Sequence, residues 1–160
     1  MVNNFRTARK VSSLLRKHNL TISSAESCTG GLLASRLTDI PGSSSYFKTG
    51  FITYSRESKL KNLKIDKNMI NNYGTISKEC AKEMANRVRF LTASDIGIST
   101  TGNLGPQTIE GRPKGEIYIA ISLLGKTIVK RLLLDGTRAK VKKEATDQAL
   151  KLLYKQLCLL

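Results

Sequence analysis

Apolar residues recur along the chain with two different periods, which predict its helices and strands. Phe5, Ala8, Val11 and Leu15 lie three or four residues apart and predict a helix over residues 3–18. Further helices are predicted over residues 30–39, 56–63, 66–74, 77–91 and 138–158. Short runs rich in β-branched and aromatic residues predict strands over residues 20–25, 46–55, 94–102, 115–123 and 126–134.

The order of these elements predicts the fold class. Helices separate the early strands, which favours parallel pairing, and the last two strands flank Leu124-Gly125 as a hairpin. We therefore expect an α/β fold of three layers, α/β/α, around a mixed, mainly parallel sheet of about five strands. At 160 residues the chain is expected to form one domain, residues 1–160.

Composition restricts the classes of function. The chain is 40% hydrophobic and 24% charged, which is typical of a globular protein, and it has no run of about 18 apolar residues for crossing a membrane. Its three cysteines form no CxxC motif, and it has one histidine. We therefore expect no metal site, no cofactor and no disulfide framework, and we expect a reducing, cytoplasmic location.

The net charge of +15 favours partners that carry phosphate. The lysines are spread along the chain rather than gathered in one block, so a basic surface without a specific partner is the alternative. Binding to nucleic acid is an open but less favoured interpretation.

The stretch SSAESCTGG, residues 23–31, lies where a strand is predicted to give way to a helix. A helix N-terminus offers free backbone N–H groups, and Gly30 and Gly31 leave room for a ligand to approach them. The turn could hold a phosphate or an oxyanion, with Ser27 as a nucleophile. The alternative is a tight turn in which Ser27 or Thr29 only caps the helix.

A serine nucleophile needs a base, and a catalytic triad is not expected. His18 is the one histidine and belongs to the polar end of the first helix, so a lysine with a lowered pKa is the remaining type of base. Cys28 is a rival nucleophile, although a small buried side chain is the simpler interpretation. Tyr54 ends the second strand, at the same sheet edge as Ser27 if the two strands are parallel.

Several longer stretches of the sequence resemble a known protein family. Residues 25–63, AESCTGGLLASRLTDIPGSSSYFKTGFITYSRESKLKNL, closely resemble the CinA carboxy-terminal domain family, the nicotinamide-nucleotide amidohydrolases. The resemblance continues through YGTISKECAKEMA, the TTG…GP…P.G region and DGTRAKVKKEA, and covers about residues 8–157. It implies a three-layer fold and hydrolysis of the carboxamide of nicotinamide mononucleotide, a small-molecule nucleotide, to nicotinate mononucleotide and ammonia. The chain looks like the stand-alone form of this domain.

The resemblance also implies roles for individual residues. The serine of AESCTGG is Ser27, the nucleophile, and the lysine of the YS-x-x-x-K block is Lys59, the base. Tyr54 would support the lysine or contact substrate, and N–H groups beside Gly30 would receive the oxyanion. The substrate-binding positions it implies are Cys28, Thr29, Gly30, Gly31, Gly102, Gly105, Arg138 and Lys142.

One loop departs from the family pattern. Relatives usually read GIAGPGGG here, whereas this chain reads GNLGPQTIEGRPKG over residues 102–115. The change points to an altered substrate preference or turnover. The alternative function is a non-catalytic module on the same fold that binds a phosphate ligand or nucleic acid. A homo-oligomer is expected in either case.

Overall fold

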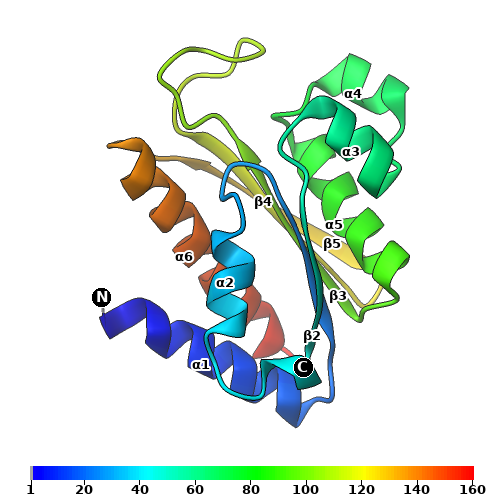
Figure 1. The fold of residues 1–160 in the computed structure, drawn as a ribbon, viewed down its shortest axis with the longest axis vertical. Helices are drawn as coiled ribbons and strands as arrows, with labels where there is room; N and C mark the ends of the chain where they lie inside the picture. Colours follow the sequence, from blue (N-terminus) through cyan, green and yellow to red (C-terminus); the bar gives the residue numbers. More distant parts are fainter. Residues whose placement is uncertain (1) are drawn as a thin grey trace.

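The computed structural model describes residues 2–160, with side chains from residue 6 onward. A five-stranded sheet lies between two layers of helices (Figure 1). Helices α1, α2 and α6 cover one face, and α3, α4 and α5 cover the other. The predicted three-layer α/β fold is confirmed.

The elements follow the predicted order, with boundaries that differ by a few residues. The helices are α1 (Val2–Lys17), α2 (Leu32–Thr38), α3 (Arg56–Leu63), α4 (Lys67–Tyr73), α5 (Lys78–Thr92) and α6 (Arg138–Leu157). The strands are β1 (Ile22–Glu26), β2 (Phe47–Ile52), β3 (Ile96–Gly102), β4 (Glu116–Leu123) and β5 (Lys126–Leu133). A short 3-10 helix, η1 (Ser43–Ser45), was not predicted.

The strand order is β2-β1-β3-β4-β5. Strand β1 pairs in parallel with β2 and β3, whereas β4 is antiparallel to both of its neighbours. The hairpin between β4 and β5 turns at Leu124 and Gly125, whose φ angles of 49° and 75° fit the tight turn that such hairpins favour. Four strands thus run in one direction, and β4 alone is reversed.

The two faces of the sheet bury separate apolar clusters because side chains alternate along each strand. On one face Leu15, Leu33 and Leu153 pack around the sheet, joining α1, α2 and α6. On the other face Leu63 and Met84 pack against Ala25 of β1 and join α3 and α5. Covered on both sides, all five residues of β1 are buried. No helix among the described residues has both the length and the apolar character needed to cross a membrane.

The polar side chain of Glu26, at the carboxyl end of β1, is buried and is 1% exposed. Its Oε2 accepts hydrogen bonds from the Thr29 hydroxyl at 2.6 Å and from the N–H groups of Gly31 and Leu33, both at 3.0 Å. Its Oε1 accepts from the N–H of Ala34 at 2.8 Å. The carboxyl group thereby caps the N-terminus of α2, which has no side-chain cap from Gly31.

We expect Glu26→Gln to destabilise the fold. An amide can place its oxygen toward three of these donors only by turning its NH₂ group toward the N–H of Ala34, where two donors would then face each other. A buried donor without an acceptor costs about 1–3 kcal/mol, so the free energy of unfolding in urea should fall by about that amount. The exposed Glu57 provides the control, since Glu57→Gln should change it by less than about 0.5 kcal/mol. Equal losses in the two variants would contradict this role of Glu26.

Candidate active site

Ser27 begins the turn between β1 and α2, at the carboxyl end of the parallel strands. Its N–H donates to the carbonyl of Thr100 in β3 at 2.9 Å, which extends the β1–β3 pairing by one residue. Its side chain is 8% exposed and lines a pocket. This is the edge at which open α/β sheets bind their ligands.

Lys59 lies in α3, and its side chain extends toward the carboxyl end of β1, where Ser27 lies. The Oγ of Ser55 accepts from the N–H of Ser58 at 3.0 Å and starts α3 directly after the loop that follows β2. The position four residues before the buried Leu63 then directs Lys59 into the protein, where it is 1% exposed. Its Nζ is 3.0 Å from Oγ of Ser27. The two residues predicted to act together are therefore in hydrogen-bond contact.

The surroundings of Lys59 Nζ favour the neutral amine. Burial lowers the pKa of Lys59 below its ordinary value of 10.5, and weaker charge interactions with Cys80, Cys28 and Glu110 oppose the shift. Nζ also donates to the backbone oxygen of Thr53 at 2.7 Å. A neutral amine has two N–H donors and one lone pair, so its lone pair can accept the hydroxyl proton of Ser27.

Cys28 is a poor rival nucleophile in this environment. It is buried next to Ser27, and burial raises the pKa of its thiol to about 12. A thiol in that state is almost entirely protonated near neutral pH, and the thiolate is the reactive form. The rival role considered from sequence is therefore not supported, although Cys28 does line the pocket.

The backbone of the turn differs from the expectation for the oxyanion site. The N–H of Gly30 donates to the Ser27 carbonyl at 3.1 Å, and the N–H of Gly31 is held by Glu26. Neither glycine lines the pocket, so the structure does not bring these N–H groups to it, and their contact with substrate stays a prediction. Their φ angles of 56° and 94° explain the glycines by backbone conformation instead. In the described part of the chain, the N–H groups of Cys28 and Thr29 donate to no other residue.

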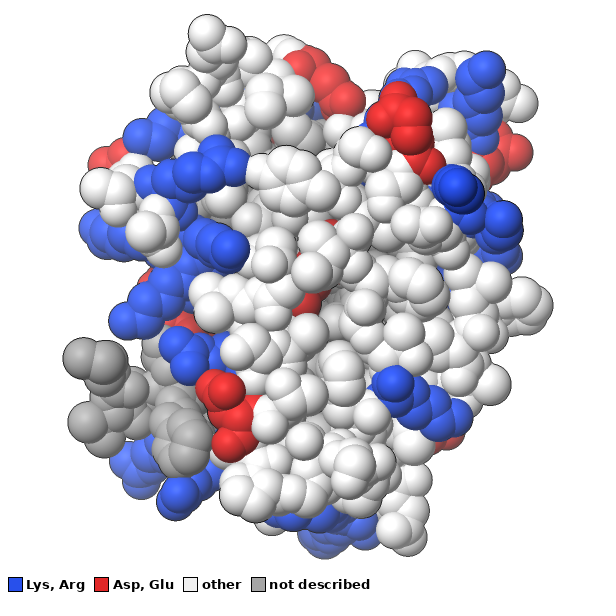
Figure 2. Space-filling model, viewed as in Figure 1, with Lys and Arg blue, Asp and Glu red and all other residues white. Residues whose placement is uncertain are grey.

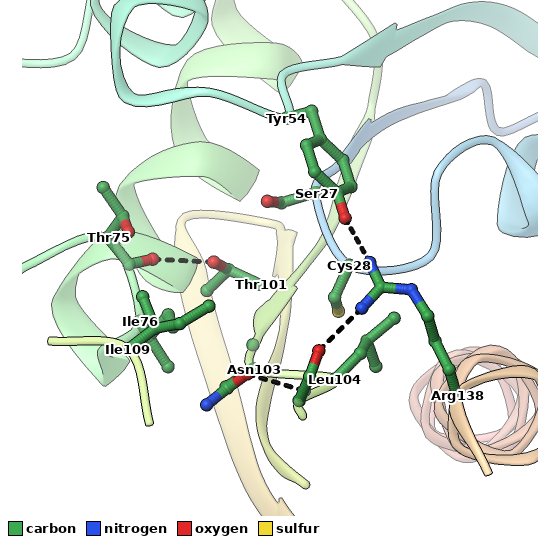
Figure 3. A pocket seen from close by; sticks show the side chains of 12 residues that line it. Ser27, Cys28, Tyr54, Thr75, Ile76, Thr101, Asn103, Leu104, Ile109 and Arg138 are labelled. Atoms are coloured by element: carbon green, nitrogen blue, oxygen red, sulfur yellow. Dashed lines mark hydrogen bonds between the residues drawn. The ribbon is translucent and has the colours of Figure 1, made fainter. Parts of the chain in front are cut away.

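The pocket beside Ser27 has a volume of about 120 Å³ (Figure 3). The sequence-predicted residues that line it are Ser27, Cys28, Tyr54, Gly102, Gly105 and Arg138. Thr29 does not line the pocket. It is fully buried, and its hydroxyl oxygen is 2.7 Å from that of Thr100. Lys142 is outside the pocket lining, and its Nζ is 3.2 Å from the point that a Cβ on Gly30 would occupy.

Tyr54 and Arg138 close one side of the pocket (Figure 3). The guanidinium of Arg138 donates to the hydroxyl of Tyr54 at 2.5 Å and to the carbonyl of Gly105 at 2.9 Å. Tyr54 therefore meets Lys59 through its backbone oxygen, 3.4 Å from Nζ, and its ring hydroxyl contacts Arg138 instead.

The opposite side of the pocket is formed by the loop over residues 102–115, the one that departs from the family pattern and that we expect to border the substrate pocket. Ile109 of this loop and Ile76, before α5, both line the pocket. Glu110 fastens the loop, because its carboxyl group accepts from the N–H and hydroxyl of Thr75 at 2.7 and 2.8 Å and from the N–H of Ile76 at 3.3 Å. Asn103, fully buried, bonds the backbone at both ends of the same loop. Ile109, within the altered residues 107–109, thus forms part of the pocket wall.

The site combines a hydroxyl group and an amine that together suit nucleophilic catalysis. Among the described residues no group of three or more His, Cys, Asp and Glu side chains is arranged to hold a metal ion. A hydroxyl in contact with a buried amine, beside backbone N–H groups at a turn, suits attack on a carbonyl carbon.

Curated relatives match most of this chain but are much longer. A protein from Clostridium novyi named "Putative competence-damage inducible protein" is 46% identical over 145 residues, which is 90% of this chain and 35% of the relative. A protein of the same name from Caldanaerobacter subterraneus is 46% identical over 133 residues, 82% of this chain and 32% of the relative. The chain therefore spans about a third of the length of these relatives.

Solved structures match over the full chain. A competence-damaged protein (CinA) superfamily protein from Klebsiella pneumoniae superposes with a TM-score of 0.95 at 28% identity, covering 99% of both chains. The competence damage-inducible protein A from another Klebsiella pneumoniae strain gives a TM-score of 0.94 at 30% identity, covering 98% of both. The model of the CinA C-terminal domain matches residues 4–157. By sequence and by fold, the chain belongs to the CinA C-terminal domain family.

Proposed function

We propose that the protein hydrolyses the carboxamide of nicotinamide mononucleotide to nicotinate mononucleotide and ammonia. The observation that carries the proposal is the 3.0 Å contact between Ser27 Oγ and the buried Nζ of Lys59, at the wall of a pocket. The names of the relatives describe no amidase activity, so the chemistry is argued from the residues and from the family resemblance.

In the proposed reaction Lys59 takes the hydroxyl proton of Ser27 as Oγ attacks the carboxamide carbon. The oxyanion forms beside the N–H group of Cys28, which lines the pocket next to Ser27. Lys59 then gives its proton to the departing nitrogen, which leaves as ammonia and yields an acyl-Ser27 ester. Water hydrolyses the ester with Lys59 again as base, which releases the carboxylate product and regenerates the serine.

The size of the pocket supports binding of the amide end of the substrate. Ligand sites commonly measure about 300–1,000 Å³, and this cavity is about 120 Å³. The planar nicotinamide ring with its carboxamide group suits that space, between Ser27 on one side and Ile76 and Ile109 on the other. The ribose phosphate would then extend out of the pocket past Arg138, toward the positive end of α6.

The proposed reaction first predicts the effect of removing the nucleophile. Ser27→Ala removes only a hydroxyl and should lower kcat for ammonia release by roughly 10⁴-fold or more while circular dichroism stays unchanged. Cys28→Ala, which removes the neighbouring thiol, should keep most of the activity. An active Ser27→Ala enzyme together with an inactive Cys28→Ala enzyme would reverse the two assignments.

The second prediction concerns the base. Because only neutral Lys59 accepts a proton and burial lowers its pKa, kcat/KM should rise with pH through an ionisation below 10.5. Arginine does not release its proton in this range, so Lys59→Arg should lower kcat by roughly 10²- to 10⁴-fold. The control, Lys61→Arg on the exposed side of α3, should behave as the unmodified protein. Normal turnover by Lys59→Arg, with the same pH profile, would exclude Lys59 as the base.

The third prediction concerns the phosphate of the substrate. If Arg138 contacts it in both the ground and the transition state, Arg138→Ala should raise KM by roughly tenfold or more and change kcat less. The exposed Lys143 of the same helix is the control, and Lys143→Ala should leave KM unchanged. Nicotinamide riboside lacks the phosphate, so it should be a poor substrate and insensitive to Arg138→Ala. An equal effect of Arg138→Ala on both substrates would show that Arg138 acts only through Tyr54 and the loop.

A further inference from the structure

Lysines that the proposed reaction does not use surround a second cavity, between α1, β5 and the second half of α6. It has a volume of about 400 Å³, within the range of ligand sites. Four lysines line it, namely Lys10, Lys130, Lys151 and Lys155. Lys151 lies 13 residues after Arg138 along α6, or about 20 Å at 1.5 Å per residue, so this cavity is separate from the Ser27 pocket.

In the part of the chain that the structure describes, no salt bridge joins any of these four lysines to a carboxyl group. The acidic residues of α6 are Glu144 and Asp147, and neither lines the cavity. Residues 1–25 and 148–160 contain no Asp or Glu at all.

Two of the lysines are held in position. The Nζ of Lys10 lies 5.3 Å from the centre of the Tyr154 ring, a cation–π contact across the groove. The Nζ of Lys130 donates to Oε1 of Gln148 at 2.9 Å. Gln148 in turn donates from Nε2 to Glu144 at 2.9 Å, which fixes the direction of its amide. These ammonium groups therefore lose little freedom when a ligand binds.

The positive charge continues beyond the cavity. Lys and Arg side chains gather along the side of the molecule formed by α6, whereas the centre of the same face carries few charges (Figure 2). On α1 the exposed cations include Arg6, Lys10 and Lys17, which recur at helical spacing on one face. The apolar face of α1 is buried through Val11 and Leu15, so the helix offers charge rather than apolar surface to a partner.

We propose that this four-lysine cavity binds an anion with two or more linked phosphate groups. Several separate ammonium groups around one concavity fit a chain of phosphates better than a lone carboxylate, because each phosphate takes its own charged donor. The half-buried ring of Tyr154 and the side chain of Leu152 supply an apolar wall beside the charges. A free polyphosphate, a nucleoside triphosphate and a nucleic-acid strand share this phosphate chemistry.

Isothermal titration calorimetry at 150 mM salt with inorganic tripolyphosphate as the probe tests the proposal. The unmodified protein should bind, and the double variant Lys151→Gln/Lys155→Gln should bind at least roughly tenfold more weakly. The control Lys61→Gln/Lys67→Gln makes the same change in net charge on exposed positions of α3 and α4 and should bind as the unmodified protein. Neither pair belongs to the Ser27 site, so the result is independent of amidase activity.

Two further probes distinguish the source of the phosphates. A nucleoside triphosphate that binds more tightly than tripolyphosphate, and loses this binding in the Lys151/Lys155 variant, would identify a nucleotide site. Tighter binding of a single-stranded oligonucleotide, with a salt dependence that falls by roughly one unit of slope for each lysine removed, would identify a nucleic-acid site. Absence of binding by all three probes, or equal weakening in the control variant, would overturn the proposal.

Discussion

The chain must turn sharply after β1 to leave Ser27 at the pocket, and this turn exposes backbone donors that the protein interior has to satisfy. The carboxyl group of Glu26 accepts four hydrogen bonds there and connects the strand end to the first turn of α2. It leaves the N–H groups nearest to Ser27 available while it uses those of Gly31, Leu33 and Ala34. The position of Ser27 therefore depends on a neighbouring side chain, that of Glu26, which lies outside the pocket lining.

The second requirement is a lysine that can accept a proton. Burial removes water from Lys59 and disfavours its charged form, which lowers the pKa of this lysine despite weaker opposing charge interactions. The oxygen of Thr53 stabilises an N–H donor without forcing a positive charge on the amine. A carboxylate in direct contact would have restored the charge, and Nζ makes its contacts with backbone oxygens and the Ser27 hydroxyl instead.

Sequence patterns were most informative where a feature depends on local spacing. The periods of apolar residues predicted the strands and helices. The choice of Lys59 rested on the resemblance of the YS-x-x-x-K block to the family, because its partner Ser27 lies 32 residues away in the sequence. The roles of Glu26 and Glu110 depend on which backbone N–H groups the turn after β1 and the loop after β3 bring to them, and the apolar periods carry no information about these contacts. For the same reason the apolar wall made by Ile76 and Ile109 could not be predicted, since the two meet only after the loop has folded.

The Ser27–Lys59 pair and the apolar side of the pocket wall come from different parts of the chain. Ser27 and Lys59 both belong to the segment from β1 to α3, which contains two adjacent parallel strands and the helix that follows each. The loop that carries Ile109 lies between β3 and β4 and is attached through Glu110 to the start of α5. The Ser27–Lys59 contact and the apolar wall thus come from separate segments, and we expect that a loop exchanged from another member of the family would reshape the pocket while leaving that contact intact.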